Sequence, residues 1–326
     1  MHRRQFSALA AACAATPFAP LARAQGAWPQ KAISWVVPFP PGGITDTTSR
    51  ALGKRMGELL GQQIVIENRP GAGGSLGTEQ VARAAPDGYT WLYGTQGTMA
   101  ANLALYKNLK YDPLKDFVPV HGMLLSPTVL VVESSRPWRS VADLVRDAKA
   151  DPGKLNFGSA GAGTATHLTG ELFQSEAGVK LTHVPYKGTS PALQDLLGGR
   201  VDLMFDYVTP MLPQIKAGKL RVLAVMNNER MEALPEVPAI SELGLPNAVS
   251  YAWSSIVVPA GTPADVVKRI GDALATVLRE PEVVGPFVTN GSKPMHNMRD
   301  KAFADFIAVE QKRWAEVVRR SGATLG

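Results

Sequence analysis

Short apolar stretches alternate with helical patterns along most of this chain, and that alternation limits its fold more than any other feature. Residues 33–37, 64–67 and 90–93 are rich in branched and aromatic side chains, and a helical pattern follows each of them. A second series of the same kind begins near Ser126. Strands that alternate with helices form parallel sheets with helices on both faces. The sequence therefore predicts an α/β fold.

The 326 residues suffice for two domains of ordinary size. The second series runs to about residue 227, and a Pro-, Glu- and Leu-rich segment over 227–247 has the composition of a crossing segment. We expect a discontinuous domain 1 over residues 25–125 and 228–326, and a domain 2 over 126–227. Within domain 2, Ser140 and Asp143 are spaced as a capping box that begins a helix.

The first 24 residues have the organisation of a secretory signal peptide. Arg3 and Arg4 precede an alanine-rich apolar stretch, and residues 22–24 fit a small-x-small cleavage site. The two arginines also match a twin-arginine signal, so both export routes stay open. We expect an exported protein. Its single cysteine, Cys13, lies in this segment, so no disulfide is expected, and no later apolar stretch is long enough to span a bilayer.

Charge argues against nucleic acid as a partner. The formal net charge is +6, and loss of Arg3, Arg4 and Arg23 with the signal would lower it to +3. The chain has no basic stripe of the kind that nucleic-acid-binding proteins carry.

Four loops follow predicted strands, at the sheet edge where open α/β folds bind ligands. They cover residues 38–46, 94–98, 158–164 and 206–209, and none contains Lys or Arg. Glycines allow main-chain N–H groups to turn toward a ligand, and a helix start adds a partial positive charge. These loops favour reversible binding of a small anion such as a carboxylate; the simpler interpretation is that they only cap helices.

From these loops we predict a set of ligand-binding residues. They are Phe39, Gly42, Gly43, Ile44, Thr45, Asp46, Thr95, Gln96, Ser159, Ala160, Gly161, Gly163, Thr164, His167 and Asp206. Asp46 fits either a helix cap or a contact to a ligand ammonium or hydroxyl, and His167 fits either a ligand contact or a packed core histidine. Ile44 and Asp206 are the side chains expected to decide which acid fits.

Motifs for enzymatic chemistry are incomplete. The phosphate-binding loop is absent, and Thr166 stands where the dinucleotide fingerprint needs a third glycine. The histidines lack metal-ligand spacing, so we expect neither a cofactor nor a metal. Residues 73–77 match G-x-S-x-G, but no strand leads directly into Ser75, which favours a helix cap. We expect no enzyme; a secreted hydrolase that uses Ser75 is the alternative.

Several segments together resemble the Bug family, the extracytoplasmic solute receptors of tripartite tricarboxylate transporters. They occur in the family's order over essentially the whole mature chain: residues 38–46, 67–74, 85–89, 158–164 with His167 and Leu168, 184–188 and 201–206. The resemblance implies a two-lobed periplasmic-binding-protein fold of type II, with the ligand cleft between the lobes. It implies that loops 42–46 and 159–164 grip a ligand carboxylate, partly through ordered water.

The resemblance also implies partners and a class of ligands. The partners are a small carboxylate and a membrane permease with one large and one small subunit, and we expect the receptor to be a monomer in the periplasm. Family ligands include di- and tricarboxylates, acidic amino acids and aromatic acids. A sensor that presents its ligand to a membrane signalling partner is the alternative within the same fold.

Overall fold

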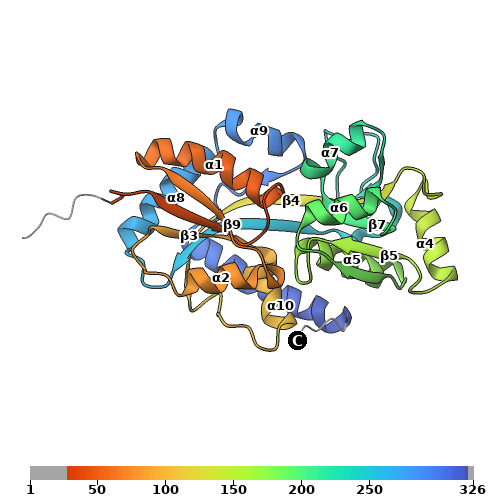
Figure 1. Cartoon of the computed structure of the whole chain (residues 1–326), viewed down its shortest axis with the longest axis horizontal. Coiled ribbons are helices and arrows are strands. Elements are labelled where there is room, and N and C mark those ends of the chain that lie inside the picture. The colour runs from red at the N-terminus through yellow and green to blue at the C-terminus, as the bar shows by residue number, and fades with distance from the viewer. Residues whose placement is uncertain (1–27, 322–326) are drawn as a thin grey trace, which may run out of the picture.

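The computed structural model describes residues 28–321, and its strands form one ten-stranded mixed sheet (Figure 1). The main path has the order β2-β1-β3-β9-β4-β7-β5-β6, while β8 and β10 pair with β4. The strands are β1 (Ile33–Val37), β2 (Ile64–Asn68), β3 (Thr90–Thr95), β4 (Phe117–Glu133), β5 (Asn156–Ser159), β6 (Thr182–Pro185), β7 (Leu203–Tyr207), β8 (Leu220–Val225), β9 (Tyr251–Pro259) and β10 (Lys293–Pro294). The predicted signal peptide lies outside the described residues.

Two long strands, β4 and β9, connect the two ends of the molecule, and Figure 1 shows them running through its middle. The first part of β4, up to Pro127, pairs with β9, and the last part, from Thr128, pairs with β7 and β8. We call residues 28–127 and 250–321 half 1, and residues 128–249 half 2. Segment 228–249, which the sequence analysis assigns to domain 1, packs through Met231, Leu234 and Ile240 into the cores of half 2.

The predicted parallel arrangement is correct for three strands in each half. Strand β1 is parallel to β2 and β3, and β5 is parallel to β6 and β7. It is wrong for β4 and β9, which are antiparallel to each other; β9 also opposes β3, and β4 opposes β7 and β8. The reason is that β4 leads the chain out of half 1 and β9 brings it back. Consequently the carboxyl ends of β3 and β7 face each other across the boundary.

Helices cover both faces of the sheet in each half. In half 1, α1 (Ile44–Leu60), α8 (Ala264–Val277) and α9 (Pro281–Thr289) share one core. On the other face lie α2 (Ser75–Ala82), α3 (Asn102–Leu105) and α10 (Asp300–Ser321). In half 2, α4 (Val141–Ala150) and α5 (Ala165–Ala177) cover one face, and α6 (Thr189–Leu197) and α7 (Val208–Lys216) cover the other.

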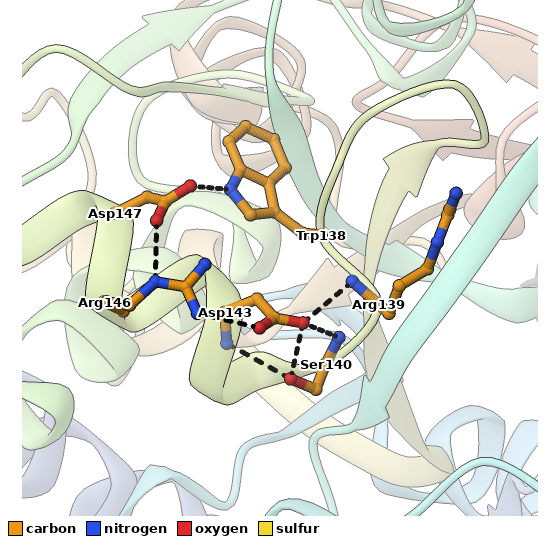
Figure 2. A network of polar contacts seen from close by, with 6 residues as sticks. All are labelled: Trp138, Arg139, Ser140, Asp143, Arg146 and Asp147. Carbon is orange, nitrogen blue, oxygen red and sulfur yellow. Dashed lines mark hydrogen bonds and ion pairs between the residues drawn. The ribbon is translucent and has the colours of Figure 1, made fainter.

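The capping box predicted for the helix after Ser140 is confirmed (Figure 2). The Ser140 hydroxyl accepts from the Asp143 N–H at 3.1 Å, and the Asp143 carboxylate accepts from the Ser140 N–H at 3.1 Å. The same network includes Arg146, which donates to Asp143 and Asp147. Across residues 28–321, the structure contains no helix long and apolar enough to cross a membrane.

Candidate functional site

A cavity lies at the boundary between the halves, where the carboxyl ends of the strands face each other. The volume open to the centres of water molecules is about 50 Å³, which is room for about three to five waters. Its lining comes from both halves: Phe39, Pro40, Pro41, Gly43, Ile44, Thr45, Thr95, Gln96, Ala160, Thr164, Ala165, Thr166, Gly188, Thr189, Ser190, Tyr207, Ala252 and Trp253. No Lys or Arg is among these residues.

One wall is the start of α1. Gly43 is the N-cap, and Ile44 and Thr45 are the first two helical residues. Gly42 has a φ of +86°, which favours glycine, and its N–H donates to the Asp46 carboxylate at 3.1 Å. Burial acts to raise the pKa of Asp46, but hydrogen bonds from Arg50 and Gly42 outweigh it and hold that pKa below its usual value. The Asp46 carboxylate therefore stabilises the turn at Gly42 and does not line the cavity.

The start of α5 forms the opposite wall. Thr164 is the N-cap, its hydroxyl accepts from the His167 N–H, and Ala165 and Thr166 follow it along the cavity. Several N–H groups of the preceding loop have partners within the loop and α5. The Ala160 N–H donates to the Thr166 hydroxyl at 2.9 Å, and the Gly161 N–H donates to the Ser159 hydroxyl at 3.1 Å. At the start of α5, the N–H groups of Ala165 and Thr166 have no partner within the helix and are available to a ligand.

A third helix start, that of α6, was missed by the sequence analysis as a site element. Gly188 is the N-cap, and Thr189 and Ser190 are the first two helical residues, so all three line the cavity. A signal was available, because a glycine and two hydroxyl residues follow strand β6 and precede Pro191. Gly188 has a φ of +135°, and a Cβ there would come within 2.9 Å of Pro40 in half 1.

Three helix starts thus converge on one cavity. The first N–H groups of a helix have no partner within that helix, and each start carries roughly half a positive charge. Together they give a site that favours an anion without a cationic side chain. No group of three or more acidic, histidine or cysteine side chains able to hold a metal ion occurs within residues 28–321. The arrangement can hold an anion, and it offers no metal centre.

Comparison with known proteins agrees with this geometry. Residues 48–323 match a family model described as "Tripartite tricarboxylate transporter family receptor". The protein BugT of Bordetella pertussis is 38% identical over 299 residues, which cover 91% of this chain and 91% of BugT. The chain belongs to the family of receptors of tripartite tricarboxylate transporters. The resemblance to the Bug family is confirmed, and the receptor family is one of solute-binding proteins and not of enzymes.

Solved structures of relatives have the same fold as the receptor. A protein of R. palustris solved with adipate has a TM-score of 0.87 and 36% identity, over 90% of this chain and 98% of its own. MatC from Rhodopseudomonas palustris, with bound malate, has a TM-score of 0.84 and 35% identity, over 89% and 100%. The expected periplasmic-binding-protein fold is confirmed.

Eight of the predicted site residues line the cavity of the receptor: Phe39, Gly43, Ile44, Thr45, Thr95, Gln96, Ala160 and Thr164. Seven do not: Gly42, Asp46, Ser159, Gly161, Gly163, His167 and Asp206. Most of the seven hold the loops in place. The Ser159 hydroxyl bonds His183 Nε2 at 2.7 Å, His183 stacks on His167 with ring centroids 4.0 Å apart, and the Gly163 N–H donates to His167 Nδ1.

An apolar wall of the receptor's cavity also escaped sequence analysis. Trp253 and Ala252 on β9, with Tyr207 at the end of β7, face the cavity beside Phe39 and Ile44. Glu310 on α10 is 6% exposed and accepts from the indole N–H groups of Trp253, at 2.8 Å, and Trp314, at 3.0 Å. Glu310 thereby fixes the Trp253 ring from behind.

The halves of the receptor meet closely at glycines. A Cβ on Gly97 would lie 2.6 Å from the Gly163 carbonyl oxygen, and one on Gly73 would lie 2.3 Å from the Ala162 carbonyl oxygen. Real Cβ atoms essentially never come under 3.0 Å. The main chains therefore approach each other only because neither Gly97 nor Gly73 has a side chain.

Ser75, the nucleophile of the alternative hydrolase hypothesis, is the first residue of α2, and Gly74 takes the N-cap position. The expectation that Ser75 caps this helix is wrong, because Gly74 occupies the N-cap position and Ser75 is already the first helical residue. The Ser75 hydroxyl accepts from the Asn102 side chain at 3.0 Å. The receptor gives it an amide partner in place of a base.

Proposed function

We propose that this receptor captures a small carboxylate in the cavity between its halves, through the first-turn N–H groups of α1, α5 and α6. The observation that supports this most is the convergence of three helix starts on a cavity whose lining contains no Lys or Arg. Relatives solved with adipate and with malate support a carboxylate as the ligand class. Hydroxyls of Thr45, Thr95 and Ser190 supply further hydrogen bonds.

We propose two roles for the predicted site residues. Those that line the cavity contact the ligand, with Phe39 and Ile44 packing against its apolar body. Gly42, Asp46, Ser159, Gly161, Gly163 and His167 keep the two gripping loops in shape. Ile44 remains the side chain whose size most directly limits the ligand, because it lies at the first position of α1 and is 7% exposed.

The receptor acts, in this proposal, as a monomer exported to the periplasm, and delivers its ligand to a permease of one large and one small membrane subunit. We also propose domain boundaries near residues 127 and 250, where β4 and β9 cross between the halves. They differ from the boundary at 228 because Met231, Leu234 and Val237 pack in a core of half 2.

A thermal-shift screen of adipate, malate and benzoate tests the proposal. At about 100 times its dissociation constant, a ligand stabilises the folded state by about 2.7 kcal/mol. At about 2–4 °C per kcal/mol, the melting temperature should rise by about 5–10 °C. A matched chloride series at equal ionic strength controls for salt. If none of these acids, nor citrate or glutamate, raises the melting temperature, carboxylate capture is refuted.

A further inference from the structure

Asp206 lies directly behind the cavity and is completely buried, at 0% exposure. Its Oδ1 accepts from the Thr189 hydroxyl at 3.3 Å and from the Tyr207 N–H at 2.7 Å. Both Thr189 and Tyr207 line the cavity. Its Oδ2 is buried without any hydrogen-bond partner. One carboxyl oxygen is therefore connected to the cavity wall, and the other has nothing to stabilise a negative charge.

No cation compensates Asp206 within the described part of the chain. The neighbouring helices and strands do carry titratable side chains, but each of these either contacts other residues or lies away from the Asp206 carboxyl. They are Asp195 on α6, which contacts Tyr186 and Arg200; His167 and Glu171 on α5, which contact each other; Glu133 and His121 on β4; Arg221 on β8; and Lys216 in the last turn of α7. Tyr207 is the titratable neighbour that interacts with it electrostatically.

A bound carboxylate would add a second negative charge close to this one. The ligand and Asp206 share the same wall, because Thr189 contributes both the hydroxyl that bonds Asp206 and a first-turn N–H of α6. Two like charges in a site of low polarity repel strongly, and one of them is then neutralised by a proton. An ionised Asp206 would also offset part of the positive potential that the start of α6 offers to the ligand.

We propose that Asp206 is protonated whenever the receptor holds its ligand, with the proton on Oδ2, so that capture of a carboxylate takes up a proton from solvent. This inference rests on the proposed function, since it concerns the same cavity. The balance is simple: the ligand anion, the ionised receptor and one proton give a complex in which Asp206 is neutral. When Asp206 is already protonated before binding, no proton is taken up.

The ionisation of Asp206 falls in a range where this coupling can be measured. Burial raises the pKa of its carboxyl to about 7, against the smaller opposing effect of the bonds from Tyr207 and Thr189. Below pH 7, Asp206 of the ligand-free receptor is mostly protonated, so the affinity for the ligand does not depend on its ionisation. Above pH 7 binding must add a proton, and the dissociation constant then rises up to about tenfold per pH unit.

Titration calorimetry with adipate and with malate, in two buffers of different ionisation enthalpy, counts the protons. We expect uptake of close to one proton at pH 8.5 and much less at pH 6, and a dissociation constant that rises about five- to tenfold from pH 7.5 to 8.5. Asp206→Asn, which resembles the neutral form, should bind without uptake and with a flat pH profile. Asp202→Asn is the control: Asp202 pairs with Arg136 at 3.0 Å, so the proton count should stay at the wild-type value.

Proton uptake that is unchanged in Asp206→Asn, or absent in the wild type at pH 8.5, overturns the inference. Infrared spectroscopy of the ligand-free wild type separates this failure from failure of the proposed function. A protonated-carboxyl band that titrates near pH 7 supports a neutral Asp206 even if none of the five acids of the thermal-shift screen binds, in which case only carboxylate capture is refuted. Absence of such a band at pH 5.5 overturns the inference whatever the receptor binds.

Discussion

Gly97→Ala tests whether the close contact between the halves supports ligand binding. Gly97 has a φ that alanine also adopts, so the substitution causes no local backbone strain. Its new Cβ would lie 2.6 Å from the Gly163 carbonyl oxygen, whereas ordinary contacts begin at 3.4 Å. The halves would have to move apart by roughly 0.8 Å at this point. Overpacking of this kind costs about 1–3 kcal/mol.

That cost applies to the arrangement in which the halves touch and form the cavity, so it should appear mainly as lost affinity. A loss of about 1–3 kcal/mol corresponds to about a 5- to 150-fold higher dissociation constant, measured by calorimetry with adipate or malate. Gly285→Ala in α9 is the matched control, because its Cβ would meet nothing within 4 Å, and its affinity should equal that of the wild type. Wild-type affinity in Gly97→Ala, with an unchanged melting temperature, would show that the contact between Gly97 and Gly163 does not support ligand binding.

Three further substitutions test the supports of the site. Asp46→Ala removes the acceptor for the Gly42 N–H and the partner of Arg50, and should lower the free energy of unfolding in urea by about 1–2 kcal/mol at pH 7. Because the pKa of Asp46 is lowered in the folded state, this loss should shrink as the pH falls below about 4. An equal loss at pH 3 would contradict this prediction. Burial, with the neighbouring His167, lowers the pKa of His183 to about 3, so the folded protein favours the neutral imidazole. The free energy of unfolding should therefore fall by about 1–2 kcal/mol from pH 7.5 to pH 5. His183→Gln should flatten this pH profile, and an unchanged slope would show that His183 is not its cause. Glu310→Ala leaves the Trp253 and Trp314 indole N–H groups without their buried acceptor, and should destabilise by about 2–5 kcal/mol with weaker ligand binding. Glu316→Ala, on the exposed side of α10, is the control and should leave the unfolding midpoint close to that of the wild type.

The sequence predicted much of the fold, because periodicity and helix starts are local properties. The strand before Pro38, the loop after it and the helix that ends at Leu60 all occur where expected. Strand direction is not local. Nothing in residues 251–258 indicates that β9 runs back from half 2 and lies antiparallel to β3. Its identification needs the path of the whole chain.

The candidate site divides in the same way. Strand–glycine–helix patterns identified the starts of α1 and α5, and the same pattern at Gly188 could have identified α6. Packing decided the rest. Ser159 and His167 belong to a predicted loop and helix, yet they turn toward His183, which comes from a different strand. Trp253 lies in an almost fully buried strand, where no alternation shows which side chains face a cavity.

A crystal structure of the receptor with adipate or malate is the sharpest test of carboxylate capture by helix starts. We expect carboxylate oxygens to lie about 2.7–3.1 Å from first-turn N–H groups of α1 and of α5 or α6. We also expect that no Lys or Arg side chain contacts the ligand. A carboxylate paired with a cation such as Lys187, or bound away from the three helix starts, would contradict it.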